Sequence, residues 1–176
     1  MPKSLAAGHT KLILADSALM AAATDKTALS LATALATTTD ISCRIAQSDF
    51  KLGPSGANTV SDPALCDQVA ADVPTTSKFD GNITPFRYFD ATGKAETGAA
   101  GEIGDAAFQA VSVMGATIWL LRRDTSKLST EALAAGDEYQ LFECVCDDYQ
   151  ETPQDGWIKH PTPLFVQNRW KGVIAA

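Results

Sequence analysis

The stretch Gly104–Asp124, which reads GDAAFQAVSVMGATIWLLRRD, decides the fold. Asp105 is a suitable N-cap for a helix, because its side chain can accept a hydrogen bond from the first turn. Gly115 then stands where helices commonly end on a left-handed residue. Thr117–Leu121 is rich in β-branched and large apolar residues, which predicts a strand buried on both faces. The apolar residues of the helix recur at spacings of three and four: Ala107, Phe108, Val111 and Met114.

Further strands are expected on both sides of this stretch. Residues 41–45 alternate between apolar and polar side chains. In residues 138–146, apolar side chains occur at both odd and even positions, so both faces of a strand there would carry apolar residues. Gly53-Pro54-Ser55-Gly56 has the composition of a turn, and residues 67–78 read as an exposed loop. Together the patterns predict a mainly β protein, an antiparallel barrel or sandwich of seven or eight strands with one flanking α-helix.

Residues 1–38 differ in composition from residues 39–176, which we interpret as the β domain. Ala, Thr, Ser and Leu dominate the N-terminal segment, and no aromatic residue precedes Phe50. We expect an extended arm with little core of its own, whose apolar residues need a partner surface to become ordered. The alternative is a terminus without fixed structure.

Charge and length exclude several classes of function. The chain has 176 residues and a formal net charge of -7, and only Arg122-Arg123 are adjacent basic residues. A protein that binds nucleic acid through phosphates usually carries a basic patch, so such binding is not expected. No run of about 18 uncharged apolar residues predicts a membrane span, and the N-terminus is a poor secretory signal. Four cysteines in a chain of this length fit a reducing, cytosolic origin.

The sequence offers little chemistry for catalysis. His9 and His160 are the only histidines, and none of the common hydrolase, phosphate-binding or zinc-protease motifs is present. Cys144 and Cys146 should share one side of a strand and would need two more ligands, for which Cys43 and Cys66 are candidates, to bind zinc. Buried thiols are the simpler interpretation, and a Cys43–Cys66 disulfide is a further alternative. We expect no catalytic residue, metal or cofactor.

The segments 40–45, 50–53, 59–66, 82–90, 115–120 and 135–137 carry a family resemblance through their order and spacing. By these segments, residues 40–176 resemble the major tail tube proteins of long-tailed, non-contractile phages that infect actinobacteria. The resemblance implies a β barrel or sandwich with a flanking helix, and hexameric rings that stack into a hollow tube. Genome DNA passes through such a tube without specific binding, and a tape measure protein fills it during assembly.

The same resemblance implies a location in the virion, assembly in the host cytoplasm, and tail terminator and tail tip proteins as further partners. A ring of six acidic chains would favour a negative lumen that lets DNA slide. Candidate lumen-facing acids are Glu138, Glu143 and Asp147. Candidate contacts with neighbouring subunits lie in the arm, at Leu12, Ile13, Leu14, Leu31 and Leu35. The rival interpretations are a virion decoration protein or other ligand-binding β domain, and a cysteine- or metal-dependent enzyme.

Overall fold

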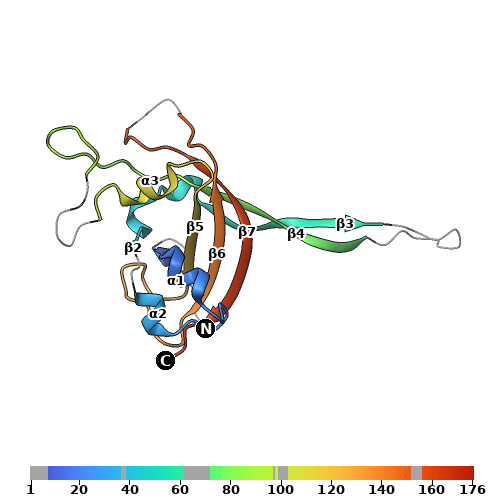
Figure 1. Ribbon diagram of the computed structural model, residues 1–176. Helices are drawn as coiled ribbons and strands as arrows, with labels where there is room; N and C mark the ends of the chain where they lie inside the picture. The colour runs from blue at the N-terminus through green and yellow to red at the C-terminus, as the bar shows by residue number, and fades with distance from the viewer. Residues whose placement is uncertain (1–7, 37–38, 62–71, 97, 99–102, 152–155) are drawn as a thin grey trace, which may run out of the picture.

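The computed structural model describes residues 8–36, 39–61, 72–96, 98, 103–151 and 156–176 (Figure 1). Its strands form one seven-stranded antiparallel sheet in the order β2-β1-β5-β6-β7-β4-β3, which confirms the predicted mainly β fold. The strands are β1 (Thr10–Ala15), β2 (Thr39–Asp40), β3 (Lys51–Val60), β4 (Val73–Ile83), β5 (Thr117–Asp124), β6 (Glu138–Cys146) and β7 (Thr162–Val173). The helices are α1 (Ser17–Ala22), α2 (Leu31–Leu35), α3 (Ala106–Val111) and the short 3-10 helices η1 (Ser42–Arg44) and η2 (Gln47–Asp49).

Each face of the sheet carries its own hydrophobic core. On β5, Ile118 and Leu120 pack under α3, whereas Trp119 and Leu121 pack under α1 and α2. We call these the α3 face and the α1–α2 face. β6 divides in the same way, because successive side chains of a strand point to opposite faces. The prediction that the central strand is buried on both faces is confirmed.

The helix of the central stretch is shorter than predicted. α3 buries Ala107, Phe108 and Val111 as expected, but it ends at Val111 and leaves the Met114 side chain 70% exposed. Asp105 precedes the helix without capping it through its side chain. The buried Asp105 carboxylate instead accepts hydrogen bonds from the Arg87 Nε at 3.1 Å and the Tyr88 N–H at 2.9 Å. It therefore ties the helix to the segment that follows β4.

The prediction of an N-terminal arm with little core of its own is wrong for residues 10–35. β1 lies inside the sheet and pairs with β5 along its whole length, from Thr10 opposite Asp124 to Ala15 opposite Trp119. α1 and α2 then cover the sheet, where Met20 and Ala34 are buried. Small and aliphatic residues supply this core, so the lack of aromatic residues did not signal disorder. Residues 1–7 and 37–38 lie outside the described part of the chain.

Three local predictions for the chain from β2 to β4 are also wrong. Residues 41–45 do not form a strand: Ser42–Arg44 forms η1, because the Asp40 carboxylate accepts the Ser42 N–H at 3.0 Å and turns the chain. The Gly53–Gly56 sequence lies within β3, and residues 73–78 belong to β4. Gly and Pro are tolerated there because β3 is the last strand of the sheet and its pairing with β4 shifts register between Pro54 and Gly56.

Candidate functional site

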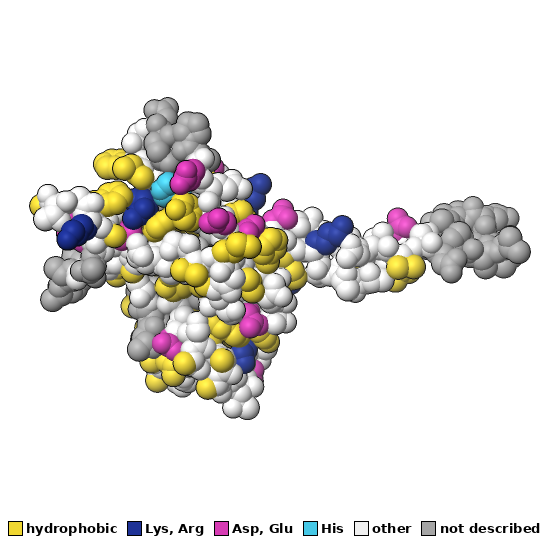
Figure 2. Space-filling view, turned by 45° about the horizontal axis from the view of Figure 1, so that its top comes forward, with side chains coloured by type: hydrophobic (Ala, Val, Ile, Leu, Met, Phe, Trp, Pro, Cys, Tyr) yellow, Lys and Arg dark blue, Asp and Glu magenta, His cyan; other side chains and the backbone are white. Residues whose placement is uncertain are grey.

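The β3–β4 hairpin projects away from the rest of the molecule (Figure 1). The two strands pair from Lys51 opposite Asn82 to Val60 opposite Val73. From Pro54 outward every described residue of β3 is exposed, and so are the described residues of β4 from Val73 to Lys78. In Figure 2 this projection is narrow and its described side chains are mostly uncharged. The described residues of the projection from Pro54 to Val60 and from Val73 to Lys78 bury nothing in their own subunit, so their surface is available to another molecule.

The base of the hairpin is firmly anchored. Leu52 and Ile83 belong to the core of the α3 face, and Arg122 donates a hydrogen bond to the Leu52 carbonyl. Gly81 crosses β7 so closely that a Cβ at this position would lie 2.6 Å from the Leu164 carbonyl oxygen. The Arg169 guanidinium lies 5.1 Å from the centre of the Phe79 ring. The direction of the projection is therefore fixed by the core.

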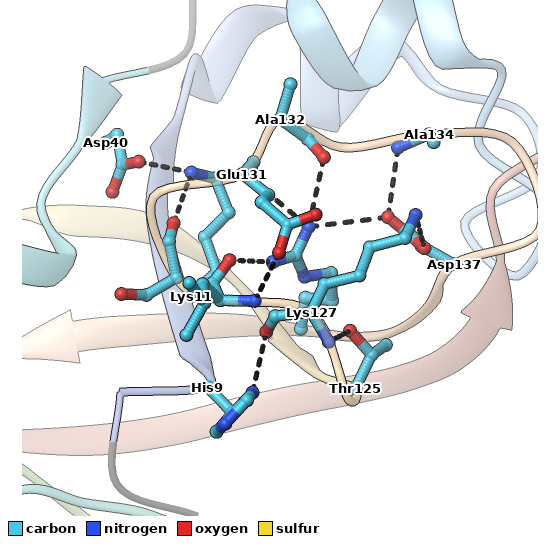
Figure 3. A network of polar contacts seen from close by, with 12 residues as sticks. His9, Lys11, Asp40, Thr125, Lys127, Glu131, Ala132, Ala134 and Asp137 are labelled. Atoms are coloured by element: carbon cyan, nitrogen blue, oxygen red, sulfur yellow. Dashed lines mark hydrogen bonds and ion pairs between the residues drawn. The ribbon is translucent and has the colours of Figure 1, made fainter.

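A polar network holds the connection between β5 and β6 against the sheet (Figure 3). The fully buried Arg123 donates to the carbonyl oxygens of Leu128 at 2.7 Å and Ala132 at 3.1 Å. Asp137 forms ion pairs with Arg123 and Lys127. Burial alone would raise the pKa of Asp137, but the hydrogen bond from Lys127 and the nearby charges outweigh it and lower the pKa below its usual value. The network therefore holds this connection in place and stabilises the subunit.

The candidate subunit contacts of the N-terminal segment do not form one surface. Leu12 and Ile13 are each only 3% exposed and belong to opposite cores of this subunit. Leu14 and Leu31 are partly buried against these two cores. Leu35 is 48% exposed at the end of α2 and is accessible to a neighbour. A contact with a neighbouring subunit stays a prediction, and Leu35 is the member best placed for it.

The candidate lumen acids do not share one surface either. Glu138 is exposed. It lies an even number of positions from Phe142 and Cys144 along β6, so its side chain is on the same side of the sheet, the α3 face. Glu143 lies an even number of positions from Tyr139 and Leu141 along β6, so it is on the α1–α2 face. Its carboxylate accepts a hydrogen bond from Asn168 at 2.7 Å. Asp147 follows the end of β6 and is half-buried. A single wall can therefore present only one of the two β6 acids.

The cysteines of β6 are core residues, as predicted. Burial raises the pKa of Cys144 to about 12 and that of Cys146 to about 11, so both remain protonated thiols at neutral pH. Cys43 is exposed and is a free cysteine in the structure, which gives the disulfide alternative no support; Cys66 lies outside the described residues. In the described part of the chain, no group of three or more His, Cys, Asp or Glu is placed to hold a metal ion.

Sequence reasoning missed the hairpin, which is the most prominent surface of the molecule. The only sequence feature that marks the hairpin is the lack of charged residues in 52–60. The composition of this segment, taken alone, favours a turn. Among the described residues, no helix has the length and apolar character that crossing a membrane requires. The whole chain, residues 1–176, matches the family model described as phage tail tube protein. A search of curated proteins gives no match.

Proposed function

Because the chain belongs to the phage tail tube protein family, and is therefore a structural subunit of a phage tail, we propose that six copies form a ring. Rings of this kind stack into a hollow tube that conducts the genome during ejection. The chemistry of the subunit fits a structural role, since its buried ion pairs hold loops and its β6 thiols are protonated.

The projecting hairpin is the observation that carries this proposal. A two-stranded hairpin is marginally stable on its own in water and gains stability when it packs on a third strand or another surface. Its exposed end carries Val60 and Val73, which are 55% and 60% exposed. In a stack of identical subunits, the hairpin of one copy reaches the next, and the exposed backbone and valines find partners there.

An acidic lumen is the second element of the proposal. The chain carries a net charge of -7, and a negative wall would repel DNA phosphates and prevent them from sticking. Because Glu138 and Glu143 lie on opposite faces of β6, the two acids give a direct test of which face lines the tube. Charge reversal to Lys at the lining face should slow DNA ejection, whereas the same change at the other face should leave ejection unchanged. Equal ejection rates in both variants would contradict an acidic lumen built from β6.

We further propose the partners that a tail tube requires. A tape measure protein would occupy the lumen during assembly in the host cytoplasm, and tail tip and terminator proteins would bind the two ends of the tube. These partners contact the ends or the interior of the stack and need no catalytic group from this subunit.

Electron microscopy of the purified full chain tests the proposal. With rising protein concentration, we expect negatively stained images to change from small particles to hollow tubes, and sedimentation velocity to show a matching rise in mass. A chain that remains a monomer or a closed dimer at every concentration would contradict the proposal. The charge-reversal variants serve as controls, because they should assemble normally.

A further inference from the structure

A half-buried histidine, His160, lies in the segment that leads into β7, residues 156–161, which we call the lead-in. The lead-in runs antiparallel to the segment that follows β4. The Arg87 N–H donates to the Ile158 carbonyl at 2.9 Å. The His160 N–H donates to the Pro85 carbonyl at 3.3 Å. The backbone therefore fixes where the imidazole leaves the chain.

The imidazole of His160 packs in a cluster of three rings. Its centre lies 5.5 Å from the centre of the Phe108 ring in α3 and 5.1 Å from that of Tyr149, which follows β6. The Phe108 and Tyr149 rings are 5.3 Å apart and meet edge to face. Because Phe108 is buried, the cluster holds both the lead-in and Tyr149 against α3.

Arg87 brings a permanent positive charge to the same cluster. Phe86 pairs with Lys159, so Arg87 and His160 are diagonal neighbours on one side of this short antiparallel pair. The Arg87 guanidinium lies 3.9 Å from the centre of the Phe108 ring, on which His160 also packs. A second positive charge on this side would therefore lie close to the first.

Asp105 balances the charge of Arg87, and its oxygens are already in use. This fully buried carboxylate accepts the Arg87 Nε–H at 3.1 Å and the Tyr88 N–H at 2.9 Å. It also accepts the side-chain amide of Gln109 at 2.9 Å. A carboxylate has about four acceptor positions, and these bonds occupy them. Asp105 is therefore not free to accept a proton donor from His160.

The Nδ1 atom of His160 is buried and has no hydrogen-bond partner among the described residues. Strand alternation puts Lys159 on the other side of the pair, where it lies 3.8 Å from Asp49. A protonated imidazole donates from both ring nitrogens, so its Nδ1–H would need an acceptor that the described surroundings do not offer. A buried charged donor without a partner, beside Arg87, is costly.

We propose that His160 is a pH-sensitive latch, in which protonation of the imidazole releases it and Tyr149 from Phe108 and frees the lead-in from α3. Histidine is the side chain that ordinarily changes charge between pH 5 and 8. The lead-in carries Trp157, which is 79% exposed, so the latch decides whether this surface residue is held in place. The inference goes beyond the tube function and does not depend on assembly.

Hydrogen exchange of the full chain tests the latch. A free histidine titrates near pH 6.5, so if only the released form binds the proton, going from pH 7.5 to 5.5 raises the released population about tenfold. After correction for the intrinsic pH dependence of exchange, protection of the Arg87 and His160 amides should fall about tenfold. Amides between β5 and β6 should keep their protection. Asp40 and Asp137, whose pKa is lowered, change charge at more acidic pH.

Two variants identify the group responsible. His160→Gln keeps a polar side chain that does not titrate, so the protection of the Arg87 amide should no longer depend on pH in this range. His9→Gln is the matched control, because His9 is the other histidine of the chain and its Nδ1 lies 3.1 Å from the Lys127 carbonyl. This variant should keep the tenfold fall. Constant protection in the unchanged protein, or the same fall in His160→Gln, would overturn the inference.

Nuclear magnetic resonance of the unchanged protein gives a second readout that needs no variant at the latch. The ring signals of Phe108 and Tyr149 should move over the same pH range as those of His160, whereas His9 should titrate without them. Titration of His160 with both neighbouring rings unmoved would overturn the latch. Failure of the chain to form tubes would count against the proposed function and leave this inference untouched.

Discussion

Replacing residues 54–79 with Asn-Gly should remove assembly while leaving the subunit folded. Gly53 pairs with Asp80, so a two-residue turn of this type can join the remaining strand ends directly. The described residues that are removed bury almost nothing in their own subunit, whereas Leu52 and Ile83, which belong to the core, are kept. The variant therefore separates the role of the hairpin in the fold from its role between copies.

The expected cost to stability is small. Among the described residues, the main interaction with the rest of the subunit that this replacement removes is that of the Arg169 guanidinium with the Phe79 ring, at 5.1 Å. Such a cation–π interaction is worth roughly 0.5–1 kcal/mol at an exposed site. The hairpin contributes little beyond this, because two strands without a third are marginally stable. A change of about 1 kcal/mol corresponds to a shift of about 2–4 °C in Tm for a domain of this size.

Circular dichroism gives the Tm of the variant, and sedimentation velocity and negative-stain images give its assembly state. We expect a nearly unchanged melting curve together with a dispersed monomer under conditions in which the full chain forms tubes. A loss of more than about 3 kcal/mol, which is typical of a truncated core residue, would show that the hairpin is part of the fold. Normal tubes would show that it is not an assembly element.

Three further outcomes test the subunit itself. Gly172→Ala should cost about 1–3 kcal/mol in urea unfolding, because its Cβ would lie 1.9 Å from the Thr27 carbonyl oxygen. Asp137→Asn should make the free energy of unfolding less dependent on pH in the acid range. Folding lowers the pKa of Asp137, so the carboxylate stabilises the fold above its unfolded pKa of about 3.9. This stabilisation is lost as the pH falls through the lower pKa of the folded state. Urea unfolding at pH 7 and pH 3 should therefore differ less in the variant than in the unchanged protein. Leu12→Ala should cost about 2–5 kcal/mol in urea unfolding, whereas Leu35→Ala should stay within about 0.5 kcal/mol, because only Leu12 is buried.

The central stretch was predictable because its signals are local. The apolar run within Thr117–Leu121 reports burial on two faces whatever the partners are. Gly115 has a positive φ of +81°, but it lies beyond the end of α3 and does not stop the helix as predicted. The end of α3 was not predictable, because the chain leaves the helix at Val111 to reach β5. The role of Asp105 also depends on a residue far away in sequence, Arg87.

The N-terminal segment and the hairpin were misjudged for one physical reason. Their structure depends on pairing with strands distant in the sequence, which composition does not report. β1 is ordered by β5, more than a hundred residues later, and the Gly53–Gly56 segment is held extended by β4. The candidate lumen acids were chosen by charge alone, and strand alternation then separates Glu138 from Glu143.

The central claim is that the hairpin joins identical copies into a tube. A cryo-electron microscopy reconstruction of tubes assembled from the purified full chain tests it most directly. The account predicts a hollow tube with sixfold symmetry, in which residues 54–60 and 73–78 lie against a neighbouring copy. A tube whose subunits meet through other surfaces, with the hairpin extending into solvent, would contradict the account.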